Sequence, residues 1–290
     1  MTRRGWALFA AMCVIWGIPY LLIRVAVREI TPAMLVFLRT AGSTLLLLPL
    51  AASHGELRSL LPRWRPLLAF AAVEIAVPWI LLSSAERRVT SSLAALLLAA
   101  TPFVGVALAT ATGGERFDRR RLAGLLVGLA GVAAIVGLDI GRTSGIGLIE
   151  MAGVVIGYAV GPWILHRYLD GLPSLGVIAA SLGLTAVVYA PIAAFQLPSS
   201  LPSGRVIASI VTLAVVCTAV GFVVFFELIV EGGPVRSNLI TYVNPAVAAL
   251  LGVLVLSERF TVGMGVGFAL VLVGSVFAAA RSRQPVVAEP

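Results

Sequence analysis

The sequence predicts an all-α integral membrane protein with ten transmembrane helices, arranged as two inverted five-helix repeats. Composition, a series of long apolar runs and an internal repeat carry this prediction. Hydrophobic residues make up 60% of the 290 residues and charged residues only 12%, and the mean hydropathy is +1.05. Soluble domains carry about 25% charged and about 45–50% apolar residues. So much apolar surface requires lipid around the chain.

The apolar runs are long enough to cross a bilayer, since a transmembrane helix needs about 20 residues. They lack the alternation of polar and apolar side chains that is typical of membrane β-barrel strands. We expect the helices at 6–27, 32–52, 66–86, 92–113, 120–138, 146–167, 174–196, 206–230, 235–256 and 261–281. The polar or glycine-rich segments between them are too short for a soluble domain.

The N-terminus combines Arg3 and Arg4 with an apolar run, as a signal peptide does. We interpret it as an uncleaved first helix, because further spans follow it directly. Most loop arginines lie on the side that holds both termini, and arginine-rich loops face the cytoplasm. We therefore expect a multi-pass inner (plasma) membrane protein with both termini cytoplasmic. The tail at 283–290 is expected to be disordered.

Several other functional classes find no support in the residues. All 21 basic residues are arginines, and their densest run, 119–121, lies between two spans, so no nucleic-acid-binding face is expected. Cys13 and Cys217 lie inside apolar runs, which indicates neither a disulfide nor a metal site. His54 and His166 form no metal-ligand pattern. Without a lysine, neither a phosphate-binding loop nor a Ser–Lys dyad exists. We expect no enzyme, no cofactor and no metal.

An internal repeat is visible when the chain is compared with itself at a shift of 143 residues. Pro102 then falls on Pro245, and Glu-Arg-Phe at 115–117 falls on the same triplet at 258–260. Apolar letters match easily by chance, whereas prolines and a charged triplet do not. A duplication is the interpretation that follows.

The duplication divides the chain into a first repeat at 1–140 and a second repeat at 141–282. Each repeat contains five predicted helices. Because five is odd, the second repeat enters the membrane upside down. Inverted repeats recur in transporters, where two similar halves can exchange conformations and open a central site to each side in turn.

On these residues the chain resembles the EamA-type members of the drug/metabolite transporter superfamily. The matching features are the two copies of Pro-x12-Glu-Arg-Phe, the spaced glycines after them, Trp16–Gly17, and Arg39 in the second helix. The resemblance covers nearly the whole chain. It implies ten helices, a central cavity and, usually, the export of small metabolites. Ser257 departs from the family pattern, in which a glycine usually precedes Glu-Arg, and Glu74 is not a residue of that pattern.

Arg39 and Glu74 are the charged residues deepest inside predicted spans, where a charge costs about 2.5–3.5 kcal/mol. Such residues commonly mark substrate or proton pathways, so we expect them to bind substrate or to couple transport to a proton. The alternatives are a structural ion pair, or an Arg39 side chain that reaches the membrane interface. Glu150 is the alternative proton site.

Pro78, Pro102 and Pro245 lie inside predicted spans, where a proline removes a backbone hydrogen bond. We expect helix breaks there, which in transporters often line the binding cavity. The alternative is a kink satisfied by a neighbouring helix. Asn244 adds a polar side chain at the level of Pro245.

Tyr158, Trp163 and Tyr242 lie near these breaks and are candidates for an aromatic cavity wall. Such a wall suits apolar or cationic ligands. The alternative for each residue is ordinary packing or an interface belt.

Glu115 and Glu258 end the fourth and ninth predicted helices, each followed by an arginine. We interpret them as caps or interface ion pairs, with gating as the alternative. Gly131 and Gly267 belong to small-residue series that allow close packing of the fifth helix against the tenth.

The sequence therefore predicts a secondary transporter that exports small metabolites, amino acids or drug-like compounds by alternating access. Its expected partners are a small-molecule substrate and the lipid bilayer, with the proton as a candidate coupling ion. A non-transporting membrane scaffold or sensor is the alternative.

Overall fold

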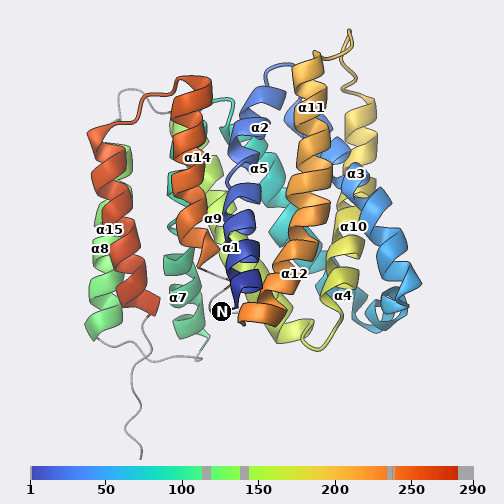
Figure 1. Ribbon diagram of the computed structural model, residues 1–290, viewed down its shortest axis with the longest axis horizontal. Coiled ribbons are helices and arrows are strands. Elements are labelled where there is room, and N and C mark those ends of the chain that lie inside the picture. The colour runs from blue at the N-terminus through green and yellow to red at the C-terminus, as the bar shows by residue number, and fades with distance from the viewer. Residues whose placement is uncertain (1, 113–118, 138–143, 234–236, 238, 280–290) are drawn as a thin grey trace, which may run out of the picture.

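The computed structural model describes residues 2–112, 119–137, 144–233, 237 and 239–279. These described residues form helices, turns and loops, with no strand among them. Seven of their helical runs are long and apolar enough to cross a membrane, and three shorter apolar helices accompany them. Figure 1 shows the helices side by side in one bundle. The chain is thus a multi-pass membrane protein, and the number of ten crossings stays a prediction.

The helices follow the chain in order, and irregular helical segments interrupt two of the spans. In the predicted first repeat they are α1 (Arg3–Ile15), α2 (Pro19–Ala26), α3 (Pro32–Ser53), the 3-10 helix η1 (Glu56–Arg63), α4 (Trp64–Phe70), the π-helix η2 (Ala71–Ala76), α5 (Val77–Ala85), α6 (Ser91–Leu98), α7 (Thr101–Ala111) and α8 (Arg119–Gly137).

In the predicted second repeat they are α9 (Gly145–Tyr168), α10 (Ser174–Ala194), α11 (Gly204–Thr212), the π-helix η4 (Leu213–Val220), α12 (Gly221–Gly232), α14 (Ile240–Leu256) and α15 (Val262–Ala279). The predicted boundary between the repeats, the triplet at 115–117 and the tail at 283–290 lie outside the described residues.

The first predicted span, 6–27, agrees with the membrane-crossing run Arg3–Ala26, which a short break divides into two helices. α1 ends at Ile15 and α2 begins at Pro19. Proline has no N–H to continue the ladder of α1. Between the two helices, Gly17 lies so close to α14 that a Cβ there would come within 2.6 Å of Val247 Cγ1. The break therefore lets the backbone of the first span approach α14 closely.

The fourth predicted span is also divided, into α6 and α7, with Pro102 in the first turn of α7. Thr101 donates from its hydroxyl to the Leu98 carbonyl over 2.7 Å. This carbonyl is the one that Pro102, lacking an N–H, leaves without its usual helical partner. In contrast, Pro245 lies inside α14, which runs past it as one helix. The two repeated prolines thus differ in effect, although they occupy corresponding positions of the sequence repeat.

α8 and α15 pack together through their backbones (Figure 1). A Cβ on Gly131 would lie 2.7 Å from the Gly267 carbonyl oxygen, and one on Gly274 would lie 2.5 Å from the Gly128 nitrogen. Small residues permit this approach between membrane helices. The predicted packing of these two helices within one chain is confirmed.

The two ends of the bundle differ in packing. We call them the N-terminal end, where α1 begins and α3 ends, and the opposite end, where α2 ends and α3 begins (Figure 1). At the opposite end, α6 packs against α2 and α14, and every residue of α6 is buried. At the N-terminal end, a cavity of about 430 Å³ is lined by Arg4, Leu50, His54, Glu56, Leu175, Val223, Phe226, Glu227, Val230 and Glu231. The opposite end also carries a cavity, of about 360 Å³, beside α11, and it is lined by Glu29, Pro198, Ser199, Ser200, Leu201 and Pro202.

Candidate functional site

Arg39 lies inside the bundle on α3, with 9% of its surface exposed. Its Nε donates to the Thr218 hydroxyl over 2.9 Å, and its Cζ lies 3.6 Å from the centroid of the Trp79 ring. The Thr218 hydroxyl in turn donates to the Leu213 carbonyl within η4, over 2.8 Å. The guanidinium is thus held by an aromatic face and a hydroxyl, which stabilise a desolvated cation less completely than a carboxylate does.

Glu74 lies in η2, and its Oε2 is inaccessible to solvent and has no hydrogen-bond partner. Room for this carboxylate comes from Gly161 on α9, where any Cβ would collide with Glu74 Oε2. The ion pairs found among the described residues do not include one between Arg39 and Glu74. The structure therefore does not form the structural ion pair that we considered as an alternative for these two residues.

Tyr158 on α9 interacts electrostatically with both Arg39 and Glu74, and it also contacts the Trp79 side chain. Tyr20 on α2 interacts with Tyr158 and Arg39. A guanidinium, a carboxyl group and two tyrosine hydroxyls therefore share one region, contributed by the first, second, third and sixth predicted spans. This group can bind a small molecule that carries both a negative and a positive group.

The π-helices place this group, because a π turn leaves backbone carbonyls available to neighbouring helices. Tyr189 on α10 donates from its hydroxyl to the Ala76 carbonyl of η2 over 2.9 Å. In η4, the Ala214 carbonyl accepts from the Ser43 hydroxyl over 2.9 Å and the Cys217 carbonyl from the Trp16 indole over 3.2 Å. Single-turn π segments occur frequently at functional sites. η2 directly precedes Pro78, which lies in the first turn of α5.

The other predicted site residues have contacts of their own. Asn244 is buried between α14 and α1, where its amide nitrogen donates to the Ile240 and Cys13 carbonyls over 3.1 and 3.2 Å. Trp163 packs edge-on against Tyr168, with ring centroids 5.8 Å apart. Tyr242 is partly buried on α14. Of the predicted site residues, the structure brings together Arg39, Glu74 and Tyr158.

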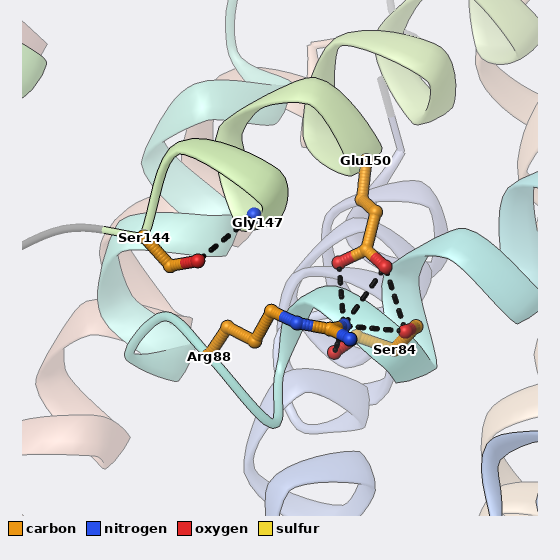
Figure 2. Close-up of polar contacts among 5 residues, drawn as sticks. All are labelled: Ser84, Arg88, Ser144, Gly147 and Glu150. Atoms are coloured by element: carbon orange, nitrogen blue, oxygen red, sulfur yellow. Dashed lines mark hydrogen bonds and ion pairs between the residues drawn. The ribbon is translucent and has the colours of Figure 1, made fainter.

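Glu150, the alternative proton site, is already paired. Its Oε1 lies 2.9 Å from Arg88 Nη1 and accepts from the Ser84 hydroxyl over 2.7 Å (Figure 2). In the same view, Ser144 accepts from the Gly147 N–H at the start of α9. Glu150 therefore ties α9 to the end of α5 through Arg88 and Ser84.

Glu258 caps a helix, but a different one from the helix that it follows. Its carboxylate accepts from the backbone N–H groups of Ser91 and Ser92 over 2.8 and 2.9 Å, and from their hydroxyls over 3.0 and 2.6 Å. These donors are at the start of α6. Ser257, with φ 56°, turns the chain back, and Gly252 leaves the space for the carboxylate. Our interpretation of Glu258 as a cap agrees with these contacts, while Glu115 lies outside the described residues.

Glu86 is a buried acidic residue that the sequence analysis did not single out. It directly follows α5 and is 0% exposed, and neither of its carboxylate oxygens has a hydrogen-bond partner. In sequence it is the last residue of a predicted span and precedes Arg87 and Arg88, a pattern typical of a solvated helix end. No signal along the chain distinguished it, because its neighbours Arg24 and Glu258 come from segments that are distant in the sequence.

Comparisons with known proteins agree with this architecture. The model of the EamA-like transporter family matches residues 3–137 and again residues 145–280. The "Uncharacterized inner membrane transporter YedA" of Escherichia coli (strain K12) is 30% identical over 258 residues, which cover 85% of this chain and 80% of that protein. The "Probable amino-acid metabolite efflux pump" of the same strain is 23% identical over 289 residues, 94% of each chain. A solved structure described as "Crystal structure of protein" shares the fold, with a TM-score of 0.68, 20% identity and coverage of 96% of this chain and 97% of that one.

Proposed function

Because the chain belongs to the EamA-like transporter family, we propose that it is a secondary transporter that exports small metabolites, amino acids or drug-like compounds by alternating access. The family resemblance predicted from the sequence is confirmed by these matches. Membership implies a transporter rather than an enzyme, a small-molecule substrate and a membrane-embedded chain. The substrate class, the direction of transport and the mechanism are our proposal.

Two structural features support inverted repeats as the basis of alternating access. η2 begins at Ala71 and η4 at Leu213, which is close to the 143-residue shift of the sequence repeat. Helix contacts also exchange under this shift: α3 packs on η4 as α10 packs on η2, and α5 packs on α9 as α12 packs on α1. Such exchange is expected when two similar halves are related by an in-plane axis.

The arrangement of Arg39 and Glu74 carries the proposal for the substrate. The two side chains are separate and unpaired with each other, and Tyr158 lies in electrostatic range of both. A zwitterionic amino acid would complete the site, with its carboxylate on Arg39 and its ammonium on Glu74. The relative named a probable amino-acid metabolite efflux pump favours the same substrate class. In the absence of substrate, Glu74 would carry a proton instead of the ammonium group, and this exchange would couple substrate transport to proton movement.

The packing of the two ends supports a direction. With both termini in the cytoplasm, as the arginine bias predicts, the larger of the two cavities opens toward the cytoplasm, whereas α6 is buried against α2 and α14 at the opposite end. A substrate would then enter from the cytoplasmic side and leave after the halves exchange conformations.

A ligand screen followed by transport tests this proposal. The purified protein is screened by thermal shift against amino acids, nucleosides, polyamines and cationic dyes, since a ligand at 100 times its Kd stabilises by about 2.7 kcal/mol. The hits are then assayed by counterflow in proteoliposomes. We expect an amino acid to bind and to exchange, and Glu74→Gln and Arg39→Gln to abolish both. Asp170→Asn, an exposed acid in a turn, is the matched control. Equal transport by Glu74→Gln would refute the assigned site.

A scaffold or sensor remains the second candidate, and water access distinguishes it from a transporter. With Cys13 and Cys217 replaced by alanine, single cysteines are introduced beside Arg39 and labelled from each side of the membrane. A transporter should expose them to one side and then, with substrate, to the other. Labels that never reach these positions from either side would favour the scaffold.

A further inference from the structure

We propose that Glu86 is a second proton-binding site, held as a neutral carboxylic acid while the opposite end of the bundle is closed, and that its proton is exchanged when that end opens. Glu86 lies away from the Arg39 and Glu74 group, at the end of α5. The proton exchange between conformations rests on the proposed function, whereas the neutral state in the present structure does not.

The surroundings of Glu86 are apolar and closed. Ala85 is 0% exposed and Val89 is 4% exposed, and both belong to the large core cluster of the bundle, together with Ala26 and Leu93. Glu86 itself is 0% exposed, and its Oε1 and Oε2 lack any hydrogen-bond partner. An ionised carboxylate without donors in such a place costs several kcal/mol, and protonation removes most of this cost.

Arg24, a positively charged neighbour of Glu86, forms no hydrogen bond with the Glu86 carboxylate. Arg24 on α2 donates instead to the backbone carbonyl of Glu86. On the turn that follows Glu86, Arg87 is exposed and Arg88 is engaged by Glu150. Arg24 thus attracts the Glu86 carboxylate electrostatically, but neither it nor another donor makes the hydrogen bond that would compensate the burial of a charge.

The acidic and phenolic neighbours favour the neutral form. Glu258, from the turn after α14, interacts electrostatically with Glu86 and is itself held by four donors from Ser91 and Ser92. Charge-assisted bonds of this kind stabilise a carboxylate at the position of Glu258. Tyr20, from α2, also interacts electrostatically with Glu86 and connects this region to Tyr158. A negative Glu258 nearby disfavours a second negative charge on Glu86.

Opening of the opposite end would reverse these conditions. α6, α2 and α14 form the closure there, and the Glu258 bonds to α6 hold it together. Separation of these elements would hydrate Glu86 and free Arg24 to pair with it, so the proton would leave. Conversely, a proton taken up from that side would favour closure. In an exporter, this step is the one that resets the empty protein for the next substrate.

Infrared difference spectroscopy tests the neutral state directly on the full-length protein. The spectrum of Glu86→Gln is subtracted from that of the wild-type protein at neutral pH. We expect loss of one carbonyl band of a protonated carboxylic acid, with the carboxylate bands unchanged. Loss of carboxylate bands instead would overturn the proposal. Asp170→Asn is the control and should remove only carboxylate bands.

If Glu86→Gln does not fold, labelling of the wild-type protein with dicyclohexylcarbodiimide tests whether Glu86 is protonated. A protonated carboxylic acid gives its proton to a carbodiimide nitrogen, and its oxygen bonds to the central carbon. The adduct then rearranges to an N-acylurea without losing any atom. Peptide mass spectrometry should find this adduct on Glu86, decreasing as pH rises, and none on Glu258 or Glu150. If Glu86→Gln does not fold, absence of the Glu86 adduct at every pH overturns the proposal.

A transport assay then separates this inference from the proposed function. If a substrate is found, Glu86→Gln should remove the dependence of transport on the pH at the opposite side while substrate binding is retained. Unchanged pH dependence would overturn the proton exchange. If no compound is transported but the acid band is present, the proposed function fails and the neutral state of Glu86 stands.

Discussion

Arg39 and Trp79 form a buried cation–π pair, with the guanidinium carbon 3.6 Å from the ring centroid. Trp79 is 6% exposed and Arg39 is 9% exposed, so water reaches neither face of the pair freely. Cation–π pairs gain strength when they are desolvated. The pair keeps a positive charge in the centre of the bundle without neutralising it, and the charge stays available to an anionic group.

Replacing Trp79 by leucine should therefore lower the free energy of unfolding by about 2 kcal/mol or more, since a desolvated cation–π contact is worth about that much. Thermal or denaturant unfolding in detergent measures the change. Trp64→Leu is the matched control, because Trp64 also faces an arginine, Arg65, but is 53% exposed. If Trp79→Leu and Trp64→Leu lowered the free energy of unfolding equally, burial of the Arg39–Trp79 pair would make no extra contribution to stability.

Gly161→Ala should displace the Glu74 side chain, because the new methyl group would occupy the position of Glu74 Oε2. We expect loss of the ligand-induced thermal shift, with a smaller effect on the stability of the empty protein. Gly204→Ala is the control, since nothing lies within 4 Å of its Cβ position. A Gly161→Ala protein that binds ligand as tightly as the wild type would contradict the role of Glu74 in binding.

Ser257→Gly should stabilise the protein by about 1 kcal/mol, because Ser257 holds φ 56°, a left-handed conformation that costs roughly 1–2 kcal/mol for a residue with a Cβ. The midpoint of denaturant unfolding reports the change. An unchanged or lower midpoint would mean that the Ser257 side chain makes a compensating interaction.

Glu258→Gln should destabilise the contact between α14 and α6, since hydrogen bonds to a charged group contribute about 1.5–3 kcal/mol and several are weakened together. The loss should exceed that of Glu227→Gln, whose partner Arg4 forms an exposed pair over 2.8 Å. Exposed pairs contribute about 0–1 kcal/mol. Hydrogen exchange should also increase at the start of α6 in Glu258→Gln, and unaltered exchange there would contradict the capping role.

Glu29 should add stability that depends on pH. Its carboxylate accepts from the Ser203 N–H over 2.6 Å and from the Ser203 hydroxyl over 2.7 Å, and these bonds lower its pKa. The contribution is therefore fully present above the ordinary glutamate pKa of about 4.3, and it is lost as pH falls through the lowered folded pKa. The difference in melting temperature between wild type and Glu29→Gln should disappear in acid. A difference that is independent of pH would exclude this origin.

Much of the architecture follows from local properties of the sequence. Apolar runs of about 20 residues have to cross lipid as helices, because no water is present there to satisfy the backbone. The close packing of α8 on α15 follows from glycine spacing. The Pro-x12-Glu-Arg-Phe pattern is also local, because each of its two copies lies within one short stretch of chain. It could therefore identify the family from the sequence.

The sequence by itself thus determined the membrane setting, the helical segments and the family, which depend on neighbours along the chain. Only the tertiary structure decided the partners of the charges. Arg39 stacks on Trp79 rather than pairing with Glu74, Glu258 caps α6, and Glu86 is buried without a partner. The physical reason is that the energy of a charge in a membrane protein depends on groups that fold next to it from distant segments, and no local pattern encodes their distances.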